Sequence, residues 1–153
     1  MITVALSTAI RADRSRIWRA LTDPVEIAGW DAPNGNAGAL DLPPEYPKPG
    51  QHVRWRYRQG GVPIVLHERP IEVVAHERLR ALLELGPLRF DATFDLLPDP
   101  GHPERTRLQQ KLVASNAVAV VGGVIDRFEM RALATGRVSR TLEAIRARCE
   151  GDA

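Results

Sequence analysis

Glu68 is the side chain of this sequence with the clearest potential for acid–base chemistry. Gly60-Gly61 is typical of a two-residue β-hairpin turn. If the chain turns there, Val53 lies opposite Glu68, and the alternation that points Val53 inward also points Glu68 inward. Loss of hydration disfavours the charged form of a carboxyl group, so an inward Glu68 could act as an acid or a base. The alternative is that Pro70 shifts the register and leaves Glu68 exposed.

Tyr57 is the second candidate on this hairpin. The same turn places Tyr57 opposite Ile64 and Trp55 opposite Leu66, which gives one apolar and aromatic face. Tyr57 could donate a proton or a hydrogen bond to a ligand beside Glu68. It could equally be a core tyrosine whose hydroxyl binds a backbone group.

Gln110 is the third polar side chain expected to face inward, because it alternates with Leu108 and Leu112. It is either a hydrogen-bond partner for a ligand or a core amide satisfied within the protein.

Other kinds of site receive no support from the sequence. The single cysteine, Cys149, excludes an internal disulfide, and there is no CxxC, HExxH, GxSxG, GxGxxG or Walker pattern. The histidines are too scattered for a metal cluster, so we expect neither a metal nor a cofactor. A formal charge of +2 without a dense basic run argues against nucleic acid as a partner. The longest apolar run, 117–125, is too short to span a bilayer, and the amino terminus does not resemble a signal peptide, so we expect a protein of the cytosol.

These side chains must be positioned by a sheet and a long helix. Alternating apolar residues predict strands at 2–11, 51–58, 79–85, 88–97 and 105–114, with the second hairpin strand interrupted by an edge or bulge at Pro70. The Pro- and Gly-rich segment 31–50 is expected to be mainly loop, with at most a short strand from Ala39 to Leu42. Asp13 and Asp23-Pro24 predict the starts of two consecutive short helices.

The last helix is predicted from Asn116, as N-cap, to Glu150. Its apolar stripe has helical spacing and consists of Val121, Val124, Ile125, Phe128, Ala132, Thr135, Leu142, Ile145 and Cys149.

The segment AIRADRSRIWRALTDPVEIAGW, Ala9 to Trp30, resembles the start of the START-like or SRPBCC superfamily. There, too, a first strand leads into a short helix with an Ile-Trp pair and then a DP helix ending in Trp. The resemblance covers essentially the whole chain. It implies one domain over 1–153 with an α+β helix-grip fold, in which a curved antiparallel sheet wraps around a long C-terminal helix. The superfamily includes polyketide cyclases and dehydrases, lipid carriers, plant allergens and activators of chaperone ATPases.

In that superfamily the ligand lies between the sheet and the final helix, and we expect such a cavity here unless side chains fill it. Small helix residues such as Ala132 and Thr135 would leave room. The residues expected to line the cavity are Trp55, Tyr57, Leu66, Glu68, Phe90, Phe94, Leu108, Gln110, Val121, Ile125, Phe128 and Ala132.

Three functions follow as hypotheses. The first is binding of a small, largely apolar molecule, which could be aromatic, polyketide-like or lipid-like. The second is a cyclase or dehydrase that uses Glu68 and Tyr57 as acid and base. The third is a protein-interaction role like that of the chaperone ATPase activators. The sequence does not distinguish a monomer from a homodimer.

Overall fold

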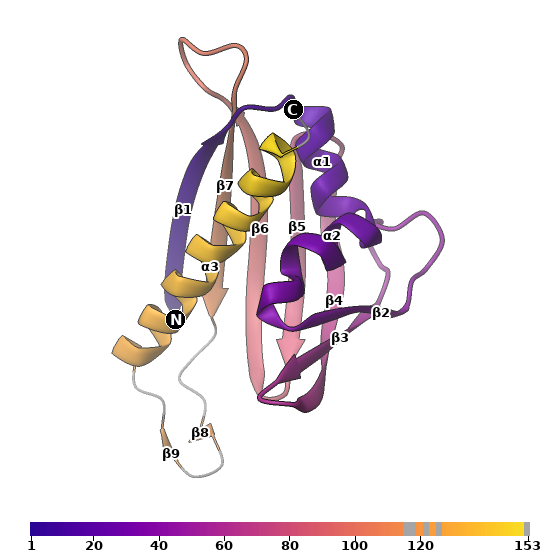
Figure 1. Cartoon of the computed structure of the whole chain (residues 1–153). Helices are drawn as coiled ribbons and strands as arrows, with labels where there is room; N and C mark the ends of the chain where they lie inside the picture. The colour runs from indigo at the N-terminus through magenta and orange to yellow at the C-terminus, as the bar shows by residue number, and fades with distance from the viewer. Residues whose placement is uncertain (115–118, 121–122, 125–126, 152–153) are drawn as a thin grey trace.

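One antiparallel sheet forms the framework of the computed structural model, which describes residues 1–114, 119–120, 123–124 and 127–151. Its strands are β1 (Ile2–Ile10), β2 (Asn36–Asp41), β3 (Val53–Gln59), β4 (Val62–Val74), β5 (Arg78–Leu85), β6 (Leu88–Pro98) and β7 (Thr106–Ala114). Their order in the sheet is β1-β7-β6-β5-β4-β3-β2, so β1 and β2 are the two edges. Helix α3 (Arg127–Glu150) crosses one face of the sheet and packs on β1 and β7 (Figure 1).

Two consecutive helices follow β1, as the sequence predicts. They are α1 (Arg14–Thr22) and α2 (Pro24–Asp31), and a short 3₁₀ turn, η1 (Ala32–Asn34), extends the second. The Asp13 carboxylate accepts the Arg16 N–H at 2.8 Å, and the Asp23 carboxylate accepts the Val25 N–H at 2.9 Å. These caps satisfy N–H groups that a helix start leaves without partners. Pro24 occupies the first turn of α2, where a missing N–H costs nothing.

The start of the last helix is a correction to the sequence prediction. The prediction that this helix begins near Asn116 is wrong for residues 119–120 and 123–124. These residues form two short strands, β8 (Ala119–Val120) and β9 (Gly123–Val124), which pair with each other. The segment is rich in valine and contains two glycines, residue types that disfavour a helix. Asn116, the predicted N-cap, lies outside the described residues.

The buried face of α3 is a second correction. Its buried side chains are Met130, Ala134, Val138, Thr141, Leu142, Ile145 and Cys149, whereas Ala132 and Thr135 are exposed. The predicted stripe was right for its last three members. It was wrong for Ala132 and Thr135, because small residues such as Ala132 fit either face of a helix. The burial of its first four members is not among the described features of the structure.

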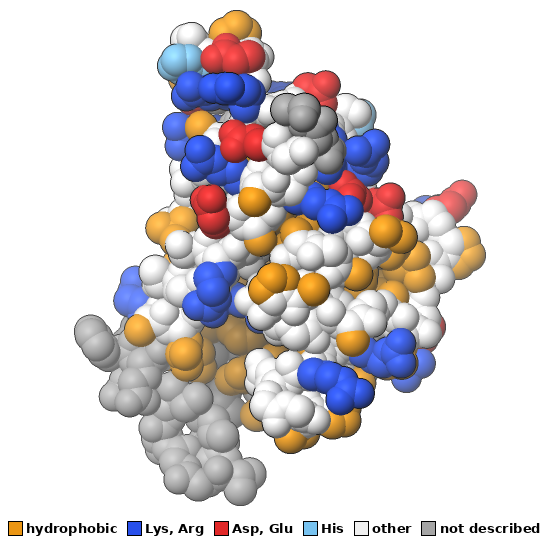
Figure 2. Space-filling view, viewed as in Figure 1, with side chains coloured by type: hydrophobic (Ala, Val, Ile, Leu, Met, Phe, Trp, Pro, Cys, Tyr) orange, Lys and Arg blue, Asp and Glu red, His pale blue; other side chains and the backbone are white. Residues whose placement is uncertain are grey.

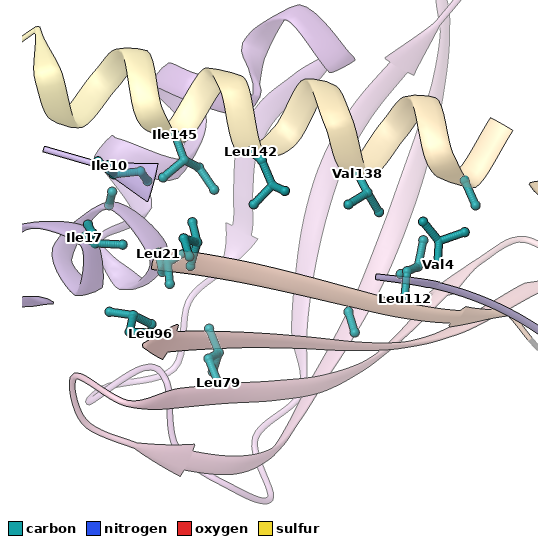
Figure 3. Close-up of a cluster of buried hydrophobic side chains, with 14 of the residues drawn as sticks. Val4, Ile10, Ile17, Leu21, Leu79, Leu96, Leu112, Val138, Leu142 and Ile145 are labelled. Carbon is teal, nitrogen blue, oxygen red and sulfur yellow. The ribbon is translucent and has the colours of Figure 1, made fainter. Parts of the chain in front are cut away.

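The core is closed most tightly where α1 and the C-terminal half of α3 meet the sheet. Val138, Leu142 and Ile145 point from α3 toward Val4, Leu112 and the α1 residues Ile17 and Leu21 (Figure 3). Side chains at this end, among them Ile10, Ile17, Leu108 and Ile145, have no exposed surface. A second cluster of buried residues, Ile27, Val53, Trp55 and Tyr57, lies on the β3 side of the sheet.

Candidate functional site

The β3–β4 hairpin forms in the predicted register. Gly60 and Gly61 have φ of 57° and 82°, backbone angles that favour glycine, and they form the turn. Val53 lies opposite Glu68, and Tyr57 lies opposite Ile64. Pro70 does produce a bulge, but this bulge lies between Pro70 and Glu72 in the pairing with β5, beyond Glu68. The prediction that Glu68 points inward is therefore confirmed, and the side chain is only 7% exposed.

Two aromatic side chains hold the Glu68 carboxylate. The Trp55 indole N–H donates to Oε1 at 2.8 Å, and the Tyr46 hydroxyl lies 2.8 and 2.9 Å from the two oxygens. Tyr46 comes from the connection between β2 and β3, which belongs to the segment that the sequence predicts to be mainly loop. An isolated aromatic residue among prolines was the only sequence signal for it.

Burial is the main influence on Glu68. It raises the pKa of the Glu68 carboxyl, and the hydrogen bonds from Trp55 and Tyr46 oppose this only in part. The pKa of the Tyr46 phenol is also raised, by burial and by the negative charge of Glu68. Glu68, on the inner face of the sheet, therefore binds a proton more tightly than an exposed carboxyl group does.

The raised pKa of Glu68 predicts a pH dependence of stability. The folded protein binds this proton more tightly than the unfolded chain, whose pKa is near 4.5. The stabilising contribution is thus fully present below that pH and is lost as the pH rises through the folded pKa. Relative to Glu68→Gln, the wild-type protein should lose stability as the pH rises from 4.5.

Urea unfolding at several pH values measures this difference, with Glu77→Gln as the control at an exposed position. A stability difference between wild type and Glu68→Gln that stays constant, or that favours the wild type more at higher pH, would contradict the assignment.

Tyr57 is buried but occupies a different polar cluster from the one predicted. Its hydroxyl donates a short hydrogen bond to Asp31, whose Oδ2 also accepts from Asn36 Nδ2 at 3.0 Å. Arg137 of α3 lies 3.7 Å from Asp31 Oδ1 and over the Tyr57 ring, 5.7 Å from its centroid. Burial, followed by the Asp31 charge, raises the pKa of Tyr57. Because the Tyr57 hydroxyl donates its hydrogen bond to Asp31, the structure does not support the prediction that Tyr57 is a proton donor beside Glu68.

Sequence reasoning missed Asp31, Asn36 and Arg137 as parts of this polar cluster. Asp31 and Asn36 lie in the segment read as loop, and both are buried. Arg137 could not be distinguished by sequence from the other arginines of the last helix. The cluster connects the end of α2, β2 and β3 to the middle of α3.

The inner face of the sheet opens toward the β3–β4 and β5–β6 hairpins. Leu66, Leu83, Phe90 and Phe94 point inward in the register of the sheet, yet all four remain only half-buried. Phe90 pairs with Leu83, and Leu83 pairs with Glu68, so these side chains form one row across three strands. Apolar side chains are visible between α3 and the segment formed by α2 and β2 (Figure 2). Leu66, Leu83, Phe90 and Phe94 thus form an apolar wall that the described side chains leave partly uncovered, and we call it the open wall.

Not every predicted lining residue lies at this open end. Trp55 and Gln110 face inward and are buried, whereas Leu108 is fully enclosed at the closed end and does not line an opening. Ala132 is exposed, so its assignment to the cavity was wrong. Val121 and Ile125 lie outside the described residues, and the structure describes only the backbone of Phe128.

A separate hollow of about 430 Å³ lies by the β2 edge and the β3–β4 hairpin. The residues that line it are Ala37, Leu40, Arg56, Tyr57, Arg58, Pro63, Ile64 and Val65. Arg56 pairs with Val65 and Arg58 with Pro63, and these positions alternate with the inward-facing Trp55 and Tyr57. This hollow is thus mainly a feature of the outer face of the sheet.

Two further observations concern the described part of the chain. It contains no group of three or more His, Cys, Asp or Glu side chains that could hold a metal ion. No helix within it has both the length and the apolar composition needed to cross a membrane.

Comparison with known proteins gives one family and a consistent fold. Residues 1–150 match the family described as polyketide cyclase/dehydrase and lipid transport. No curated protein matches the sequence. Among solved structures, a START superfamily protein from Mycobacterium smegmatis superposes with a TM-score of 0.78 at 16% identity, and the match covers 99% of each chain. A protein from Chromobacterium violaceum gives 0.74 at 20% identity, with 97% of this chain and 96% of the other covered. At these identities the structural matches establish the helix-grip fold alone.

Proposed function

The chain belongs to the polyketide cyclase/dehydrase and lipid transport family of the START-like superfamily, and on this premise we propose that it binds a small, largely apolar molecule between α3 and the inner face of the sheet. The observation that carries the proposal is the partial exposure of Leu66, Leu83, Phe90 and Phe94. Inward-facing side chains of a sheet covered by a helix are ordinarily buried, and interiors are close-packed. Apolar surface left open on the inner face favours an apolar occupant, because burying it releases roughly 25 cal/mol per Å².

The charge distribution supports an uncharged ligand body. The inward polar groups near the open wall include Glu68, which already accepts from Trp55 and Tyr46, Tyr57, which donates to Asp31, and Gln110, which lies opposite Phe94. An anion would meet the carboxylate of Glu68 without a compensating cation on that row. A neutral ligand avoids this cost.

Native mass spectrometry of gently purified protein tests the proposal. We expect a fraction of the protein to carry a small molecule, and we expect ligand-free protein to take up the neutral fluorescent probe N-phenyl-1-naphthylamine. Protein at the bare chain mass that also fails to take up the probe would contradict the proposal.

A polyketide cyclase or dehydrase type of enzyme is the second candidate, and the raised pKa of Glu68 favours it. In such an enzyme Glu68 would transfer a proton to or from a ligand held against Leu83 and Phe90. Its hydrogen bonds to Trp55 and Tyr46 favour a structural role instead, which is why binding is the first proposal. With a ligand in hand, an enzyme should lose about 10²- to 10⁴-fold in turnover in Glu68→Gln at nearly constant affinity.

A further inference from the structure

Gln110 is a polar side chain placed in the middle of the apolar inner face. It lies on β7, opposite Leu6 of β1 and Phe94 of β6, with Leu108 and Leu112 two residues away on the same strand. Helix α3 packs on β1 and β7, so Gln110 belongs to the part of the sheet that this helix crosses. Its side chain is only 8% exposed, whereas its cross-strand neighbours Leu6 and Phe94 are half-buried.

The oxygen of the Gln110 amide lacks the hydrogen bond that a buried carbonyl oxygen normally accepts. Its Oε1 is buried and has no hydrogen-bond partner among the described residues. Other inward polar groups are satisfied: Glu68 accepts from Trp55 and Tyr46, and the Thr106 hydroxyl donates to the Ala12 carbonyl at 2.9 Å. Leaving a buried carbonyl oxygen without a donor is costly, and leucine or methionine at this position would avoid that cost.

A ligand can supply the missing partner. We propose that Gln110 is the polar anchor of the binding site and that the ligand is an apolar molecule carrying a hydroxyl group. A hydroxyl can donate to Oε1, and it can accept from the Gln110 amide N–H if the amide turns over, so it suits either orientation of the side chain. The half-buried Phe94 and Leu6 on either side would then contact the apolar body of the ligand. This inference rests on the proposed function, since it assigns a chemical class to the occupant of the same space.

Two matched probes and two matched variants test the proposal. The probes are 2-naphthol and 2-methylnaphthalene. They have the same ring system, but 2-naphthol carries a hydroxyl group where 2-methylnaphthalene carries a methyl group. Gln110→Met keeps the approximate size of the side chain and removes its hydrogen bonding. We expect it to weaken 2-naphthol binding about 3- to 10-fold, the value of one hydrogen bond, and to leave 2-methylnaphthalene within about twofold. Gln109→Met, the outward neighbour on β7, should change neither affinity.

Stability gives a second and independent readout. Because Gln110→Met removes a buried oxygen that has no hydrogen-bond partner in the described part of the chain, the melting temperature of the ligand-free variant should rise above that of the wild type. A lower melting temperature of Gln110→Met, or an equal loss of affinity for both probes, would show that Gln110 supports the fold. Either result would contradict the proposal that Gln110 is the polar anchor of the binding site. If both probes bind the wild type and Gln110→Met weakens 2-naphthol binding no more than 2-methylnaphthalene binding, Gln110 is not the polar anchor, while the proposed function stands. If neither probe binds the wild type, the proposed function fails and the anchor fails with it.

Discussion

Replacing Glu26 with leucine is expected to lower the free energy of unfolding by about 3 to 5 kcal/mol, the usual cost of removing one member of a buried ion cluster. Glu26 lies on α2 with 12% of its side chain exposed. Its Oε1 is 2.5 Å from Arg16 Nη1 of α1, and its Oε2 is 2.5 Å from Arg148 Nη2 of α3. The substitution would leave two guanidinium groups facing each other at the junction of the three helices. Thermal or urea unfolding measures the effect.

Glu143→Leu is the matched control, because Glu143 also lies on a helix and contacts an arginine but has 71% of its side chain exposed. Exposed ion pairs contribute little, so this variant should stay within about 0.5 kcal/mol of the wild type. Equal effects of the two substitutions would contradict the role assigned to Glu26.

The Glu26 cluster should also respond to pH in the direction opposite to Glu68. Burial alone would raise the pKa of Glu26, but the hydrogen bonds and charges of Arg148 and Arg16 together lower it. Its stabilising contribution is therefore present above the unfolded value of 4.5 and is lost as the pH falls through the folded pKa.

Much of the fold could be predicted because its signals are local. The hairpin at Gly60-Gly61 fixed the pairing of Val53 with Glu68, since a two-residue turn leaves one register. Asp13 and Asp23 marked two helix starts through the capping chemistry of their carboxylates. Strict alternation in β6 assigned Phe90 and Phe94 to the inner face.

The parts of the site that were missed depend on contacts between distant segments. Tyr46 reaches Glu68, and Arg137 reaches Asp31, across 22 and 106 residues of sequence respectively. The segment around Tyr46 has no periodic pattern, and the helical pattern around Arg137 does not distinguish this arginine from the others on the last helix. The phase of α3 failed for a different reason: alanine is compatible with both faces of a helix, so Ala132 gave no information about which side is buried.

Two adjacent leucines on β5 allow a matched test of ligand binding on the inner face of the sheet. Leu83 points inward between Glu68 and Phe90 and is half-buried, whereas Leu82 points outward and is 41% exposed. A tryptophan at 83 should occupy the space next to the open apolar wall. A tryptophan at 82 adds the same side chain on the opposite face of the sheet.

Titration of both variants with N-phenyl-1-naphthylamine is the most direct measurement. We expect Leu83→Trp to stay folded, with a melting temperature close to that of the wild type, and to lose at least about tenfold in affinity, or about 1.4 kcal/mol of binding free energy. Leu82→Trp should bind like the wild type. Equal probe affinities of Leu83→Trp and Leu82→Trp would contradict a binding site between α3 and the inner face of the sheet. Destabilisation of Leu83→Trp alone by about 1 to 3 kcal/mol, the cost of overpacking a filled core, would contradict it as well.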